Sequence, residues 1–251
     1  MSNKKYLFGR YATKTDVGRI RVSNEDRCIA LTNTRGNILL VVCDGMGGQN
    51  KGELASSMAI DSISRAFQEK PRFLNRFTAR RWVANAVRTA NSELFREASK
   101  NMDYQGMGTT ITLVLIVGDY MVVAQAGDSR AYSYRARTLT QITEDQTYVQ
   151  YLYRIGEIKE EEIATHPKRH VLMNALGIYP SLDLDIKVHP YLNDSILVCS
   201  DGLYNNVANK DILSIMRSSD TPDQKVNELV SLANANGGSD NIAVVIWEAQ
   251  E

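Results

Sequence analysis

Three runs of apolar residues each lead into an aspartate, and this feature constrains the fold more than any other. The runs precede Asp44, Asp128 and Asp201, are short and rich in β-branched residues, and end next to glycine. Such runs are typical of buried strands. An ionised carboxylate at the end of a buried strand is costly unless a cation or hydrogen bonds compensate for its lost hydration. The sequence therefore predicts buried strands whose ends carry a cation site.

Two more aspartates, Asp26 and Asp240, extend this acidic set to five. Several converging anions would repel one another unless divalent cations lay between them, and hard cations such as Mg²⁺ or Mn²⁺ prefer oxygen ligands. A single aspartate beside glycine is equally well explained by a turn, because aspartate bonds its own backbone and glycine accepts positive φ. Five in one chain favour a shared metal site over five separate turns.

The composition argues against several other classes of protein. The 251 residues include 29 basic and 29 acidic side chains, so neither nucleic acid nor an anionic membrane is expected as an obligate partner. No apolar stretch reaches the roughly 18 to 20 residues of a membrane span. The N-terminal residues lack the apolar core of a signal peptide, so a cytoplasmic protein is expected. Cys28, Cys43 and Cys199 have no CxxC spacing and predict neither a disulfide framework nor a zinc cluster.

Strand-like and helix-like segments come in groups along the chain. Runs rich in β-branched residues and bounded by turn residues predict strands at 38–44, 110–117, 120–126, 130–135, 195–200 and 242–247. Helical spacing of apolar residues predicts helices at 52–68, 78–99 and about 222–235. Thr78 is expected to cap the second helix, and Gly118 with Asp119 predicts a tight hairpin. Grouped strands with paired helices between them favour one α+β domain, spanning 1–251, with antiparallel sheets covered by helices.

The segment at about 143–190 differs from the rest because it is polar, charged and largely helical in pattern. Its glutamate run at 160–162 is typical of a solvated helix face. A polar insertion between two core strands that lead to site aspartates is also placed to form a flap over that site. His166 precedes Pro167, which favours extended backbone, so an anchoring role is favoured over a catalytic one.

Eight short motifs occur in order along most of the chain. They lie at 16–26, 44–48, 52–56, 106–110, 127–130, 175–177, 200–203 and 239–242, and include AspGlyMetGlyGly, GlyAspSerArg and SerAspGlyLeu. Each motif alone is weak, but together they cover about 16–245. In this the chain resembles the metal-dependent serine/threonine protein phosphatases of the protein phosphatase 2C family, in its bacterial branch.

This resemblance implies a fold and a metal centre. The fold is a four-layer α/β/β/α sandwich, in which two antiparallel sheets pack face to face with a helix pair outside each. The centre is a pair of Mn²⁺ or Mg²⁺ ions, with Asp44 bridging both. The carbonyl of Gly45 would bind one ion, and Asp201 and Asp240 would hold the other.

Further site residues follow from the resemblance alone. Glu25 and Asp26 match positions that contact water on the metal ions. Asp128, together with Asp201, matches a weaker third metal site of bacterial members. Arg21 matches the arginine that binds the phosphate group.

The implied activity is hydrolysis of phosphoserine and phosphothreonine in proteins by a monomer that opposes a eukaryotic-type serine/threonine kinase. Uncatalysed hydrolysis of phosphate monoesters is extremely slow. Two ions about 3.5 to 4 Å apart lower the pKa of a shared water to give a bridging hydroxide, and they stabilise the attacking and leaving oxygens. A guanidinium then holds the phosphoryl group for in-line attack. The motifs contain no nucleophile with an adjacent base, so no phosphoenzyme is expected.

Two other functions stay open on the sequence. A pseudophosphatase would bind phosphoproteins without turnover, although the complete set of aspartates argues against it. A small-molecule phosphatase or phosphodiesterase on the same scaffold is the second alternative, and comparing a phosphopeptide with a phosphodiester substrate would separate the two.

The chain departs from the family pattern at three positions. Met46 stands where eukaryotic members have a histidine proposed as general acid, a change that bacterial members share, so water is expected to protonate the leaving oxygen. Gln146 stands where relatives commonly have histidine, and Asn174 where an arginine is frequent. The last two changes bear on substrate preference and flap dynamics and leave the metal positions intact.

Overall fold

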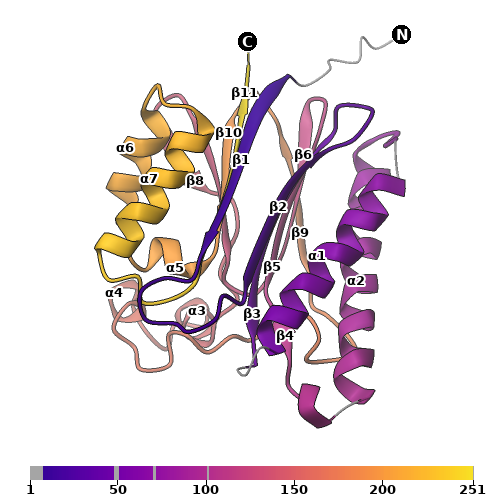
Figure 1. Ribbon diagram of the computed structural model, residues 1–251, viewed down its shortest axis with the longest axis vertical. Helices are drawn as coiled ribbons and strands as arrows, with labels where there is room; N and C mark the ends of the chain where they lie inside the picture. Colours follow the sequence, from indigo (N-terminus) through magenta and orange to yellow (C-terminus); the bar gives the residue numbers. More distant parts are fainter. Residues whose placement is uncertain (1–7, 48–50, 70–71, 101, 251) are drawn as a thin grey trace.

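Two antiparallel sheets pack face to face at the centre of the molecule (Figure 1). The structure is a computed structural model that describes residues 8–47, 51–69, 72–100 and 102–250. One sheet has the strand order β1 (Gly9–Asp16), β11 (Ile242–Ala249), β10 (Ser195–Cys199), β7 (Arg130–Arg135) and β8 (Thr138–Gln141). The other has the order β2 (Asp26–Thr32), β3 (Ile38–Met46), β5 (Ile111–Val117), β6 (Tyr120–Ala126) and β9 (Asp185–Pro190), with β4 (Gly108–Thr109) paired to β3.

Helices cover the outer face of each sheet. The long helices α1 (Lys51–Glu69) and α2 (Arg76–Lys100) pack on the sheet of β2, β3, β5, β6 and β9. Helices α6 (Asn209–Arg217) and α7 (Pro222–Ala235) pack on the other sheet. The remaining helices are the short η1 (Met102–Tyr104), α3 (Tyr148–Arg154), α4 (Glu160–Ile163) and α5 (Asp201–Tyr204). The predicted α+β sandwich of four layers is confirmed.

The continuous apolar runs in the sequence arise because the central strands are covered on both faces. In β3, Leu39 and Val41 face the helices α1 and α2, whereas Leu40 and Val42 face the second sheet. All four are fully buried, and each such side chain contributes about 1.5–3 kcal/mol through the hydrophobic effect. The two hydrophobic layers therefore hold the end of β3, where the site begins, in a fixed place.

The strands missed by the sequence analysis are mostly edge strands. All six predicted strands and all three predicted helices are present within two residues at each end, and the hairpin pairs Val117 with Tyr120 around Gly118, whose φ is +60°. By contrast β1, β2 and β9 lie at sheet edges, where side chains meet solvent and apolar alternation fades.

In the described part of the chain, no helix combines the length and apolar character needed to cross a bilayer.

Two local predictions were wrong. The range 143–190 includes β9 at its end, which pairs with β6 as part of the sandwich, so the insertion between core strands ends at about residue 184. We call residues 143–184 the flap segment. Helix α2 begins at Arg76, and its cap is Asn75, whose side chain accepts from the Thr78 N–H at 2.9 Å while the Thr78 hydroxyl accepts from the Asn75 N–H at 3.1 Å.

Candidate metal centre

Strand pairing brings the predicted acidic residues together. Asp26 and Asp44 are direct partners across β2 and β3, while Asp201 follows β10 and Asp240 precedes the neighbouring strand β11. A cleft of about 980 Å³ is lined by most of the predicted site residues, namely Arg21, Glu25, Asp44, Gly45, Asp128, Asp201 and Asp240. Asp26 is 1% exposed and lies outside this lining.

Hydrogen bonds fasten the two sheets to each other at the site. The Ser200 hydroxyl donates to Asp26 Oδ2 at 2.6 Å and accepts from the Ala243 N–H at 2.8 Å, so one side chain links β2 to the β10–β11 pair. At the end of β3, the Asp44 N–H donates to Thr110 Oγ1 at 3.0 Å, and its carbonyl accepts from the Thr110 N–H at 2.8 Å. The backbone around Asp44 is therefore held on both sides before any ligand binds.

Gly45 occupies a place where no side chain fits. A Cβ atom there would collide with the carbonyl of Gly52 and with that of Glu25. The Gly45 N–H donates to the Glu25 carbonyl at 3.2 Å. This close backbone approach explains why glycine follows Asp44, independently of any role for its carbonyl.

The carboxylates repel one another inside the protein. Burial raises the pKa of Asp26 to about 7, and the charge of Asp201 adds to this effect. Burial together with Asp201 raises the pKa of Asp128 to about 8, and burial together with Asp240 raises that of Asp201 to about 6. The pKa of Asp44 lies well above its ordinary value, first through burial and then through Asp26 and Asp201. Such a cluster is stabilised by cations.

The donor atoms fit hard divalent cations in their chemistry, because they are carboxylate oxygens and one backbone carbonyl. In the parts of the chain described above, no three His, Cys, Asp or Glu side chains converge in an ion-binding arrangement as they stand. Two of the carboxylates are engaged elsewhere: Arg21 Nη2 contacts Asp240 Oδ2 at 2.7 Å, and Asn205 Nδ2 donates to Asp201 Oδ2 at 3.0 Å. Each of these bonds uses one carboxylate oxygen, and an ionised carboxylate has further lone pairs that can bind an ion.

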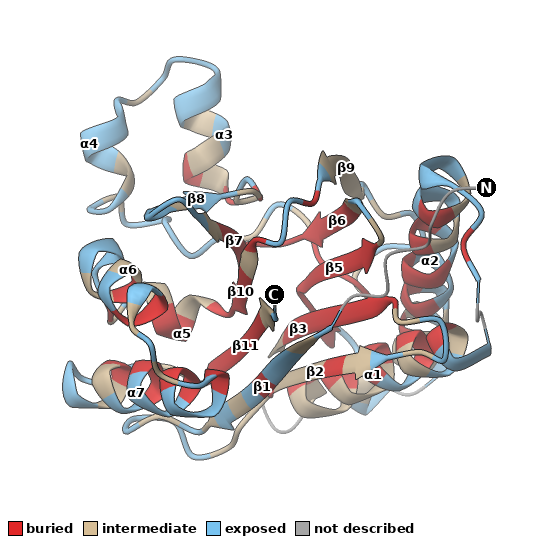
Figure 2. Ribbon diagram, turned by 90° about the horizontal axis from the view of Figure 1, so that it is seen from above, coloured by how far each residue is buried: buried red, intermediate tan, exposed pale blue. Residues whose placement is uncertain are grey.

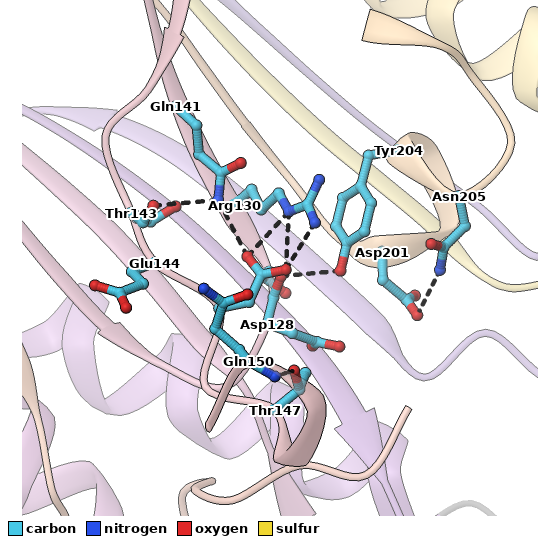
Figure 3. Close-up of polar contacts among 12 residues, drawn as sticks. Asp128, Arg130, Gln141, Thr143, Glu144, Thr147, Gln150, Asp201, Tyr204 and Asn205 are labelled. Atoms are coloured by element: carbon cyan, nitrogen blue, oxygen red, sulfur yellow. Dashed lines mark hydrogen bonds and ion pairs between the residues drawn. The ribbon is translucent and has the colours of Figure 1, made fainter. Parts of the chain in front are cut away.

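The turn that carries Asp128 is supported by an arginine (Figure 3). The Arg130 guanidinium binds Asp145 through two nitrogens, with Nε to Oδ1 at 3.0 Å and Nη2 to Oδ2 at 2.7 Å. It also lies 3.6 Å above the centre of the Tyr204 ring, and the Tyr204 hydroxyl donates to the Asp128 carbonyl at 3.1 Å. Burial opposes the charge of Arg130, but the bond to Asp145 outweighs it and raises the pKa of the guanidinium.

Sequence reasoning missed three residues of this region. Arg130 belongs to the GlyAspSerArg motif, so its position was a usable signal, whereas nothing local marked Tyr204. His170 of the flap segment lines the cleft, and burial followed by the charge of Arg169 lowers its pKa. His166, which the sequence singled out instead, accepts through Nδ1 from the Lys168 N–H at 3.1 Å and is absent from the cleft lining.

The sequence profile of Protein phosphatase 2C matches residues 21–242. The chain belongs to the protein phosphatase 2C family. It is 36% identical to the serine/threonine phosphatase stp of Listeria monocytogenes over 236 residues, which are 94% of each protein. This membership confirms the family predicted from the eight motifs, and the chain is a protein phosphatase by class.

Solved structures of relatives have the same fold. The S. agalactiae serine/threonine phosphatase superposes with a TM-score of 0.91 at 34% identity, covering 97% of this chain and 100% of that one. The catalytic domain of the serine/threonine protein phosphatase PstP, solved in complex with two manganese ions, superposes with a TM-score of 0.86 at 32% identity, covering 98% and 100%. The four layers of this phosphatase are thus those of the protein phosphatase 2C family.

Proposed function

We propose that this chain hydrolyses phosphoserine and phosphothreonine in proteins with the help of two Mn²⁺ or Mg²⁺ ions. One observation carries the proposal: Asp44 from one sheet and Asp201 and Asp240 from the other line a single cleft together with Arg21. The similarity to the manganese-bound PstP domain supports the choice of cofactor. The similarity to the Listeria enzyme supports the choice of substrate.

The acidic residues would hold the ions in the following way. Asp44 would bridge both ions, the Gly45 carbonyl would bind one of them, and Asp201 with Asp240 would bind the other. Asp128 and Asp201 would hold a weaker third ion. When bound, the ions supply an activated water as nucleophile and positive charge that stabilises the phosphoryl group.

The chain's own residues bind and orient the substrate. Arg21 would leave Asp240 and donate to two phosphoryl oxygens, because a guanidinium matches phosphate in a bidentate geometry. Glu25 at the cleft surface and Asp26 beneath it would accept hydrogen bonds from water and orient it, Asp26 being held by Ser200. Met46 lines the cleft, and since a thioether carries no proton to donate, water protonates the leaving oxygen.

The proposed substrates are folded or unfolded phosphoproteins that reach the cleft beside the flap segment. His170 and Leu172 of that segment form part of the cleft wall, where the chain around the phosphorylated residue would lie. A eukaryotic-type serine/threonine kinase would produce these substrates. We further propose that the enzyme acts as a cytoplasmic monomer.

Hydrolysis of a phosphothreonine peptide tests this function directly. The protein is treated with a chelator and assayed with and without added Mn²⁺, and activity that returns with the metal is the expected result. No activity in either case, with Mn²⁺ binding still detected by calorimetry, would favour binding of phosphoproteins without turnover. Faster cleavage of a phosphodiester than of the peptide would favour the alternative substrate class.

A further inference from the structure

Within the flap segment, residues 171–174 form a wall between two cavities. Leu172 lines the catalytic cleft of about 980 Å³, while Met173 and Asn174 line a second cavity of about 600 Å³. Val171 is 47% exposed and Met173 is 51% exposed. A segment with space on both sides gains little from dispersion contacts or burial, so its position depends on polar bonds.

Gln146 makes the polar bonds that tie this wall to the Asp128 turn. Its backbone N–H donates to the Gly127 carbonyl at 2.9 Å, and its Oε1 accepts from the Gly127 N–H at 3.1 Å. On the other side, its backbone carbonyl accepts from the Met173 N–H at 2.8 Å, and its Oε1 also accepts from Asn174 Nδ2 at 2.8 Å. One glutamine thus joins the residue before Asp128 to the wall of the cleft.

The turn is the rigid side of this connection. Gly127 has a φ of +106°, and a Cβ atom there would collide with the side chain of Thr110. Buried Gln125 donates through Nε2 to the carbonyls of Gly127 at 3.2 Å and of Ser129 at 3.0 Å. Because the turn is held from the sheet, the bonds of Gln146 fix the position of the wall at 171–174 relative to the turn.

We propose that Gln146 and Asn174 form a latch that positions the wall at 171–174 against the Asp128 turn and thereby shapes the binding site for the polypeptide around the phosphorylated residue. The proposal rests on the proposed function and extends it to substrate binding. Gln146 acts here as a positioning residue, since it lies outside the lining of the catalytic cleft. The two members of the latch contact each other directly through their side chains.

The test replaces Gln146 by methionine, which keeps the length of the side chain and removes its acceptor oxygen. For Gln146→Met we expect the KM for a phosphothreonine peptide to rise by about tenfold, the effect of losing two hydrogen bonds. We expect turnover of p-nitrophenyl phosphate, which has no peptide to contact the wall, to stay within about twofold. Amide exchange at Met173 should become faster. Its N–H donates to the backbone carbonyl of Gln146, and without the two side-chain bonds that carbonyl is held less firmly.

Gln150→Met is the matched control. Gln150 lines the same second cavity, and within the described part of the chain its side chain makes no hydrogen bond. The same chemical change there should therefore alter neither the KM nor the exchange at Met173. Asn174→Ala removes the other half of the latch and serves if Gln146→Met does not fold. In the double variant the losses should be smaller than the sum of the two single losses, since both break one contact.

The outcomes separate the latch from the proposed function. If the wild-type protein hydrolyses the peptide but Gln146→Met and Asn174→Ala leave both the KM and the exchange at Met173 unchanged, the latch is overturned and the function stands. If the wild-type protein cleaves no phosphopeptide, the function fails, while the exchange measurement still decides on the latch. An equal effect of Gln150→Met would attribute the change to the cavity and overturn the latch as well.

Discussion

The acidic floor of the cleft and the flap segment are built in opposite ways. The floor consists of Asp26, Asp44 and Asp201. Asp44 and Asp201 stand at the ends of strands that are buried on both faces, and Asp26 pairs with Asp44 from the neighbouring edge strand. By contrast, α3 and α4 are short and bury only Val149 between them (Figure 2). The floor is positioned by hydrophobic layers and backbone ladders, and the flap segment by a few polar contacts. The acidic floor therefore rests on the core, while the flap segment can vary without disturbing it.

The largest effect should come from removing a carboxylate of the floor. For Asp44→Ala or Asp201→Ala we expect turnover of a phosphothreonine peptide to fall below detection with Mn²⁺ present. The metal-free variant should remain folded, because removing one of several buried carboxylates relieves repulsion. Activity assays and circular dichroism check both statements, and near-normal turnover in either variant would remove the metal site from the floor.

Stability of the metal-free protein should fall as pH rises. The folded-state pKa values of Asp26, Asp128 and Asp201, about 7, 8 and 6, all lie above the ordinary value of 3.8. The folded protein therefore holds protons more tightly than the unfolded chain, and this stabilisation, complete below about pH 4, is lost as pH rises through 6 to 8.

Thermal unfolding in chelator at pH 5.5 and pH 8 measures this dependence. We expect the lower Tm at pH 8, and we expect Mn²⁺ to raise it most there, because ligands must be deprotonated to bind. Asp26→Asn should flatten the pH dependence. A Tm that increases from pH 5.5 to pH 8 in chelator would contradict the mutual repulsion in the floor.

The variant Arg21→Ala tests whether the phosphate group of the substrate binds beside the acidic floor. Its side chain is 53% exposed, so Arg21→Ala should leave the fold intact. We expect the KM for the phosphopeptide to rise by about 10- to 100-fold, the usual effect of losing charge-assisted hydrogen bonds. Steady-state kinetics measure this, with Arg19→Ala as a neighbouring arginine outside the cleft lining. Unchanged KM and turnover would place the phosphate elsewhere.

The smallest effect should come from Tyr204, at the boundary between floor and flap segment. Tyr204→Phe keeps the ring beneath Arg130 and removes only the hydrogen bond to the Asp128 carbonyl. We expect a loss of about 1 kcal/mol in the free energy of unfolding, or about 2–4 °C in Tm for a chain of this size. A much larger loss would show that the hydroxyl supports the floor as well as the turn.

Several long-range contacts at the site left no mark in the sequence. The edge strand β9 lies in a polar stretch of the sequence, because its side chains meet solvent. The hydrogen bond between Gln146 and Asn174 joins residues that are 28 positions apart. Arg130 of β7 pairs with Asp145 in the loop before α3 and stacks on Tyr204 of α5, so this partnership joins two elements of the core to the flap segment. None of these contacts has a periodicity or composition that a local pattern could reveal.

By itself the sequence determined the buried strands and the identity of the acidic residues, because continuous apolar runs and their terminal aspartates are local consequences of burial on two faces. The four layers were predicted from the resemblance of the motifs to a known family. Only the tertiary structure decided which of those residues line one cleft, that Asp26 lies beneath it, and that Arg21 contacts Asp240. It also decided how the flap segment is attached. The physical reason is that burial in a hydrophobic core requires apolar residues at regular, short spacings along the chain. A single hydrogen bond between distant side chains depends instead on how the whole fold places those side chains.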